Sequence, residues 1–215
     1  NTAGSDIITF AIGSGAQTIN LSSALPTITS VIHIQGDSQV GFSGEPLIAL
    51  NGASAGAGSA GLVFSGAGAA GGSVEYLAIN NFSSSGIRIT STSNISVAGN
   101  YLGTNLAGSA AAGNQVGVYI IDSANNVIGG STAADRNLIS GNALYGIYIN
   151  AQSVAGRGSN NVVQGNWIGV NATASAALPN VNDALIVLSG GAGNQIGGTA
   201  AGAGNLFQRA SGNRR

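Results

Sequence analysis

Residues 117–150 read GVYIIDSANNVIGGSTAADRNLISGNALYGIYIN, and this stretch decides the fold. It contains three short segments in succession, at 117–120, 126–130 and 137–142, and the first of them returns at 146–149. Each segment has apolar residues at alternate positions and is bounded by Asn, Gly or Ser. This pattern is typical of short β-strands and not of helices.

The three segments repeat along most of the chain. Copies of segment one begin at Gly61, Gly86, Gly117, Gly146 and Ala184, which gives spacings of 25, 31, 29 and 38 residues. A repeat of this length indicates a solenoid, in which units too small to bury a core alone stack on their neighbours. With three strands in each unit, the sequence predicts an all-β fold: a single parallel β-helix with three short strands per coil.

We expect one β-helix domain over residues 1–215, because no change in composition suggests a linker. Its regular coils span 86–208, preceded by irregular coils at 1–85 and followed by a short tail at 209–215. In the irregular coils, strands are predicted at 7–12, 17–21, 31–34, 47–50, 62–64 and 76–79. The remainder of 52–73 is rich in Gly, Ala and Ser and is predicted as loops.

The composition excludes several classes of function. Only 6% of the residues are charged, against roughly 25% in typical soluble proteins, and the formal net charge is −1. No basic cluster is available to neutralise a row of phosphates, so we expect no nucleic-acid partner. The chain has no cysteine and hence no disulfide framework, and it has no apolar run long enough to span a membrane. A surface so poor in charge favours association.

An asparagine opens segment three in every regular coil. The four residues are Asn100, Asn137, Asn166 and Asn205. Asparagine tolerates the left-handed backbone that a sharp corner needs, and its side chain bonds to nearby backbone. Stacked coils are predicted to place the four in a structural ladder with a spacing of about 4.8 Å. Two of the coils also carry an insertion after segment three, at 106–116 and 172–183.

The repeated pattern NxIGG…NLISGN…GIxI…NxVxGNxIGxN resembles the right-handed parallel β-helix domains of large bacterial secreted and cell-surface proteins. The opening DIITFAI…QTINLSSALPTIT…VIHIQGD resembles the start of the same domains, and the likeness covers about residues 5–208. It implies a right-handed solenoid of pectin-lyase-like architecture and a secreted or cell-surface location in a bacterium. Enzymes and passive surface modules both use this architecture, so the resemblance by itself assigns no activity.

The acidic residues give no basis for catalysis in the sequence. Two carboxylates must lie within several Å of each other to divide the acid and base roles of polysaccharide cleavage. No two acids share a register in adjacent regular coils; the seven are Asp6, Asp37, Glu45, Glu75, Asp122, Asp135 and Asp183. Asp135 and Arg136 are interpreted as a solvated loop pair, and His33 as structural. We therefore expect no catalytic residue, no metal site and no cofactor.

Two rows of outward side chains are predicted to be mostly apolar or aromatic. Alternation along segment one points Ile147 into the core and Tyr148 outward. The segment-one stripe consists of Arg88, Tyr119, Tyr148 and Ile186, and the segment-three stripe of Tyr101, Leu138, Trp167 and Leu206. Contiguous apolar stripes usually mark contact surfaces. Three interpretations stay open: loops or strand curvature bury the stripes, Tyr119 and Tyr148 hold a sugar ring, or a protein binds there.

These observations favour a non-enzymatic structural protein of the cell surface or extracellular matrix that associates with other copies of itself. The strand edges at the ends of a β-helix invite pairing with another chain, and joining an end to a start propagates into a filament unless rotation closes it. Residues 6–12 and 205–215 are expected near such a junction. The alternative is a carbohydrate-binding or polysaccharide-cleaving module of a larger secreted protein, with a glycan as partner.

Overall fold

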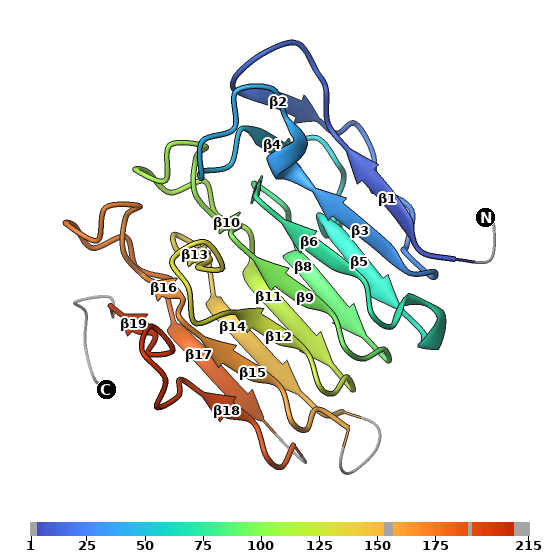
Figure 1. The fold of residues 1–215 in the computed structure, drawn as a ribbon, viewed down its shortest axis with the longest axis vertical. Coiled ribbons are helices and arrows are strands. Elements are labelled where there is room, and N and C mark those ends of the chain that lie inside the picture. The colour runs from blue at the N-terminus through green and yellow to red at the C-terminus, as the bar shows by residue number, and fades with distance from the viewer. Residues whose placement is uncertain (1–3, 153–156, 189–190, 209–215) are drawn as a thin grey trace.

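The computed structural model describes residues 4–152, 157–188 and 191–208. The predicted tail at 209–215 lies outside the described residues. Within them, the chain winds through three parallel sheets of stacked short strands, so that each complete coil adds one strand to each sheet. Figure 1 shows the strands in rows, with β1 and β19 at opposite ends of the stack. The predicted parallel β-helix with three strands per coil is confirmed.

The three sheets, named A, B and C, correspond to segments two, three and one of the repeat. Sheet A is β1 (Asp6–Thr9), β3 (Ile32–Gln35), β6 (Ser73–Glu75), β9 (Ser96–Ala98), β12 (Val127–Gly129), β15 (Val162–Gln164) and β18 (Gln195–Ile196). Sheet B is β2 (Gln17–Asn20), β4 (Ile48–Asn51), β7 (Leu77–Asn80), β10 (Tyr101–Leu102), β13 (Leu138–Ile139), β16 (Trp167–Ile168) and β19 (Leu206–Phe207). Sheet C is β5 (Leu62–Ser65), β8 (Ser85–Thr90), β11 (Val116–Ile121), β14 (Tyr145–Asn150) and β17 (Asp183–Leu188).

The irregular N-terminal coils contain elements that the sequence pattern does not reveal. β6 lies at Ser73–Glu75, at the end of the stretch predicted as loops, and pairs with both β3 and β9. It has a single apolar residue, Val74, so it carries no detectable alternation. Two 3₁₀ turns, at Gly36–Ser38 and Ala67–Ala69, also form in these coils.

The core consists of inward side chains stacked in register between the sheets. In sheet C, for example, Val118 of β11 pairs with Ile87 of β8 below it and with Ile147 of β14 above it. All three side chains are completely buried. Because strands of two to six residues offer only a few inward positions, each coil depends on its neighbours to cover its apolar residues. The core is therefore closed in the middle of the stack and open at its two ends.

The alternation can be tested with two neighbouring positions of β14. Ile147→Asn places an amide among aliphatic layers where it has no hydrogen-bond partner, and we expect a loss of about 4 kcal/mol or more in the free energy of unfolding. Tyr148→Asn, on the outward side, loses mainly its ring contacts, worth about 1 kcal/mol. Urea unfolding of both variants measures the difference. Equal losses would show that the inward and outward assignment is wrong.

Candidate functional site

The four asparagines that open segment three form a continuous ladder of hydrogen bonds, here called the sheet B ladder. The backbone N–H and the side-chain Nδ2 of Asn137 both donate to Oδ1 of Asn166 in the next coil, at 3.3 and 2.9 Å. Nδ2 of Asn137 also donates to the Val97 carbonyl in the preceding coil, at 2.8 Å. Asn100 and Asn166 repeat this arrangement, whereas Asn205, the last member, accepts from Asn166 and donates its Nδ2 to the Val163 carbonyl. The left-handed residue at this corner is the preceding glycine in two coils, Gly99 and Gly165, and not the asparagine.

Two further asparagine ladders occupy the other corners of the coil. One joins Asn114, Asn142 and Asn180 before sheet C, and the other joins Asn126, Asn161 and Asn194 before sheet A. Both are largely buried and use the same donors and acceptors as the sheet B ladder. The sequence holds their signal, because an asparagine begins segment two and another lies shortly before the next segment one in successive coils. Sequence reasoning found only the first of the three ladders.

All three ladders point in the same direction along the solenoid. Each asparagine donates its backbone N–H toward the C-terminal end, so the last member of each ladder has a donor but no following acceptor. Within the described residues, the backbone N–H groups of Asn180, Asn194 and Asn205 have no hydrogen-bond partner. Among the described residues, the C-terminal end of the stack therefore carries three backbone donors without an acceptor.

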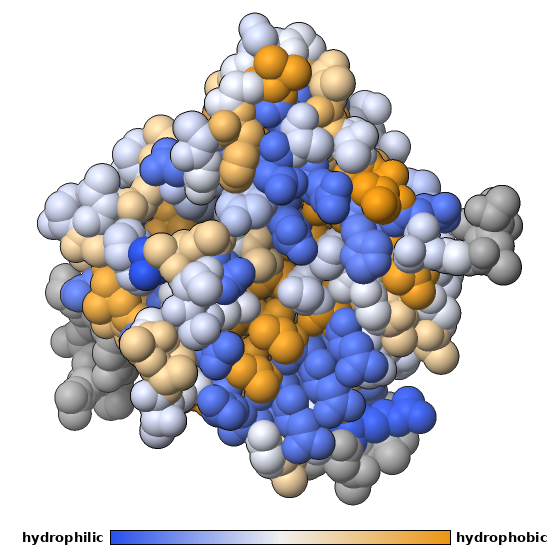
Figure 2. Space-filling model, in the orientation of Figure 1, coloured by the Kyte–Doolittle hydropathy of each residue, from blue (hydrophilic) through white to orange (hydrophobic). Residues whose placement is uncertain are grey.

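Apolar side chains are exposed at both ends of the solenoid. Near the N-terminal end, Ile7 of β1 is 60% exposed and the inward residue Ile8 is 42% exposed. At the C-terminal end, the inward residues Ile196 and Phe207 are 41% and 43% exposed. Figure 2 shows hydrophobic side chains over the positions of β1 and β19. Each end also has a hollow, one lined by Ile8 and the segment 25–30, the other by 183–185 and Phe207.

The segment-one stripe lies on the outer face of sheet C and is half-buried. The rings of Tyr119 and Tyr148 stack with centroids 4.8 Å apart and planes at 6°. The Arg88 guanidinium lies 5.8 Å from the centroid of the Tyr119 ring, and Tyr145 packs against Tyr148 at 5.3 Å. Burial, together with the neighbouring Tyr119 and Tyr145, raises the pKa of Tyr148. Tyr119 thus has a neighbour on each face, which leaves its ring edge for an outside ligand.

The segment-three stripe is largely buried, which agrees with the first of the three interpretations that the sequence left open. Tyr101 and Leu138 are buried, Trp167 is half-buried, and among the four only Leu206, in the last coil, is exposed. The two insertions after segment three are the cause, because each folds back in a short antiparallel bridge. Their residues Leu106 and Ala172 pack against the stripe and, together with Val170, form with it a second small apolar cluster outside the main core.

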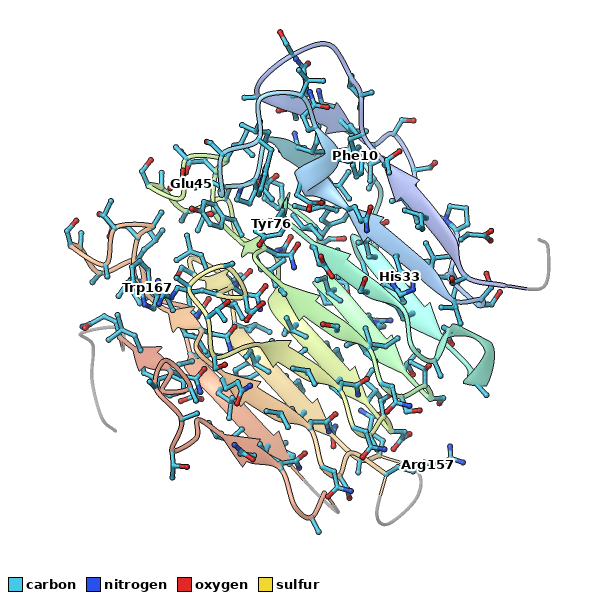
Figure 3. The ribbon with its side chains drawn as sticks, in the orientation of Figure 1. Phe10, His33, Glu45, Tyr76, Arg157 and Trp167 are labelled. Atoms are coloured by element: carbon cyan, nitrogen blue, oxygen red, sulfur yellow. The ribbon has the colours of Figure 1, made fainter. Side chains whose placement is uncertain are left out.

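A cleft of about 150 Å³ remains beside this second cluster. Its wall includes Glu45, Tyr101, Arg136 and Trp167, and Figure 3 shows Glu45 and Trp167 on the same side of the molecule. The Arg136 guanidinium lies over the Trp167 ring at 4.3 Å, and its Nε donates to the Gly165 carbonyl at 3.4 Å. Burial, with a contribution from Glu45, raises the pKa of Tyr101 to about 12. Arg136 is therefore a packed residue, and not half of a solvated pair with Asp135.

The outer face of sheet A brings together acidic residues that the sequence did not connect. Burial raises the pKa of Glu75, the charges of Asp37 and Asp135 raise it further, and the Ser73 hydrogen bond and His33 lower it. His33 Nδ1 lies 2.9 Å from Ser73 Oγ, on the neighbouring strand of sheet A. The side chain of His33 therefore has a structural hydrogen bond. Within the described ranges, no three His, Cys, Asp or Glu side chains are grouped so that they could hold a metal ion.

Comparison with known proteins gives no significant match to a family model, to a curated protein or to a solved structure. The resemblance noted in the sequence therefore stays a prediction. In the part of the chain that the structure describes, none of the helical segments has the length and apolar character needed to cross a membrane.

The ladder can be tested by comparing an interior member with a terminal one. Asn137→Ala leaves the Asn100 N–H and the Val97 carbonyl without their partners inside the protein. Since unsatisfied buried groups each cost about 1–3 kcal/mol, we expect a loss of about 3 kcal/mol or more in the free energy of unfolding. Asn205→Ala, at the open end, is the matched control and should cost clearly less. Similar losses in urea unfolding would contradict the ladder's role.

The pKa of Glu75 predicts a specific dependence of stability on pH. Because its pKa is raised in the folded state, the folded protein holds this proton more tightly than the unfolded chain does. The associated stability is present below the ordinary pKa of 4.5 and is lost as the pH rises through the folded value. Glu75→Gln should therefore reduce the fall in unfolding midpoint between acid and neutral pH, with Glu45→Gln as the control. An unchanged pH dependence would rule out this contribution.

Proposed function

We propose that this protein is a non-enzymatic structural unit that associates end to end with further copies of itself, in the extracellular matrix or at the cell surface. The observation that carries the proposal is the state of the two ends, where open strand edges coincide with exposed core residues. Ile8 at one end and Phe207 at the other belong to inward rows and lack a covering coil among the described residues. Covering them removes apolar surface from water, which is favourable.

The two different ends of the solenoid favour a growing chain of copies over a closed dimer. The N-terminal and C-terminal ends are different surfaces, so joining one to the other is a heterologous contact that repeats with every added copy. Each contact continues the hydrogen-bond ladders of the sheets, as strand addition does in other β-assemblies. The expected product is therefore a linear oligomer or filament, with β1, β2, β18 and β19 at the junction.

The sides of the solenoid support this arrangement because they offer less apolar surface than the ends. The insertions cover Tyr101 and Leu138, which removes most of the segment-three stripe as a lateral contact. The low charge of the chain, with a formal net charge of −1, gives little repulsion between copies. The location outside the cell rests on the resemblance noted in the sequence.

The geometry favours self-association over sugar binding on the tyrosines. A sugar ring is held on an aromatic residue through the flat face of the ring, and both faces of Tyr119 have neighbours, Tyr148 and Arg88. A polysaccharide-cleaving site would need an acid with a raised pKa, and Glu75 has one. The main cause of its raised pKa is burial, and its side chain is hydrogen-bonded to Ser73. The contacts of Tyr119 and Glu75 within the protein are therefore sufficient to explain their positions, and no bound sugar is needed.

Sedimentation velocity across the micromolar range tests the proposal. We expect the mean sedimentation coefficient to rise with concentration, and negatively stained material to contain linear particles. Phe207→Lys places a charge in the junction and should weaken association at least about tenfold, which is about 1.4 kcal/mol. Val127→Lys is the matched control and should associate normally, because Val127 is half-buried on the outer face of β12, an interior strand of sheet A.

Two results would contradict the proposal. A monomer at every concentration would mean that the ends are covered by something other than a second copy, such as further coils of a longer chain. Cleavage of a polysaccharide by the purified protein, lost in Glu75→Gln while the fold is retained, would show that the function is enzymatic.

A further inference from the structure

We infer the register of the end-to-end junction: Asn194 of one copy stacks on Asp6 of the next, and Asn205 stacks on Gln17. This inference rests on the proposed self-association and specifies how the two ends meet. In this register, two of the three asparagine ladders, those that end at Asn194 and Asn205, find side-chain oxygens at the matching places of the N-terminal coil.

The place of Asp6 follows from the strand pairing in sheet A. Asp6 pairs with Ile32 in the next coil. Extending the pairing of the following strands by one residue continues this row through Gly72 and Ile95. Ile95 donates its backbone N–H to Asn126 Oδ1, the first acceptor of the sheet A ladder. The row then runs through Asn126 and Asn161 to Asn194. Asp6 and Asn194 are therefore the two ends of one row.

The place of Gln17 follows in the same way from sheet B. Gln17 pairs with Ile48, and Ile48 pairs with Leu77. The Leu77 backbone N–H donates to Asn100 Oδ1 at 2.9 Å, which begins the sheet B ladder. The ladder then ends at Asn205. Gln17 and Asn205 are the two ends of this second row.

The chemistry of the two ends is complementary. Asn194 and Asn205 each carry a backbone N–H that has no partner among the described residues. In the ladders, such an N–H is accepted by a side-chain carbonyl oxygen of the next coil. Asp6 supplies a carboxylate and Gln17 an amide oxygen, whereas Ile32 and Ile48, one coil further in, have no side-chain acceptor. A carboxylate that accepts two N–H groups forms the stronger, charge-assisted kind of hydrogen bond.

The apolar rows match in the same register. Ile196 and Ile8 are the two ends of one inward row of sheet A, and Phe207 and Ile19 are the two ends of one inward row of sheet B. Stacking the copies covers Ile196 with Ile8 and Phe207 with Ile19. The contact between copies is made by sheets A and B, because the first described strand belongs to sheet A and the last belongs to sheet B. Between two stacked copies, one strand of sheet C is therefore missing.

Engineered cysteines can report the register directly, since the chain has no cysteine of its own. Thr18 and Leu206 end one outward row of sheet B, so Thr18→Cys/Leu206→Cys places the two sulfurs on adjacent strands of different copies. Neighbouring strands are about 4.8 Å apart, within the range of about 4.4–6.8 Å between Cα atoms that a disulfide needs. Within one copy the same positions are six strand spacings apart, roughly 29 Å.

The matched control is Asn20→Cys/Leu206→Cys, which moves one cysteine two residues along β2 on the same face. We expect oxidised Thr18→Cys/Leu206→Cys to give a series of covalent oligomers on a non-reducing gel, and the control pair to give far fewer. Sedimentation of the reduced proteins is measured alongside. If the reduced proteins associate but the control pair cross-links as well or better, the register is wrong and the proposed function stands. If they do not associate, both are wrong.

A second set of variants tests the acceptor. Asp6→Asn keeps an oxygen at the ladder position and should retain most of the association, losing only the charge-assisted part of the hydrogen bond. Asp6→Leu has a similar size but no acceptor, and we expect its dissociation constant for self-association to rise about tenfold. Thermal unfolding of the dilute monomer confirms that both variants are folded. Equal association of Asp6→Asn and Asp6→Leu would remove Asp6 from the junction and overturn its part of the register.

Discussion

The structure depends on the buried hydrogen bonds of its asparagine ladders. A coil with three strands must turn three corners, and each corner brings backbone N–H and C=O groups into a region that water does not reach. The asparagine amide has one acceptor and two donors, so a single side chain joins the preceding coil, its own coil and the following coil. Asn100 shows all of this, because its Nδ2 donates to the Val74 carbonyl, the Ala98 carbonyl and Asn137 Oδ1. These bonds act together with the packing of the apolar rows to hold the coils in register.

The choice of neutral amides fits the unusual composition of the chain. A buried charge needs a partner and loses its hydration, whereas a buried amide needs only its hydrogen bonds. The ladder supplies these bonds by repetition, so the protein can hold completely buried polar residues such as Asn100 and Asn166 with only 6% of its residues charged. Among the described residues, the last member of each ladder lacks the acceptor that the next coil supplies elsewhere.

The sides and the ends of the solenoid are treated differently by the sequence. Along the sides, insertions fold back over the outward residues of sheet B and give Tyr101 and Leu138 a cover of their own. On sheet C, the outward tyrosines cover one another by stacking. At the ends, the inward residues Ile8 and Phe207 have no such cover among the described residues. The apolar side chains on the sides of the solenoid are therefore covered by nearby parts of the chain. Among the described residues, those at the two ends are not.

The sequence by itself determined the coil, because alternation within short segments and their return at a regular interval need no knowledge of distant contacts. It also located one ladder, since Asn100, Asn137, Asn166 and Asn205 occupy a fixed place in the repeat. It did not determine that β6 exists, because a strand with the single apolar residue Val74 is defined only by its neighbours. Burial of the segment-three stripe was likewise decided by tertiary structure, because only the fold places residues of the insertions over it. The rows that end at Asp6 and Gln17 required the strand register, which is set by packing between coils.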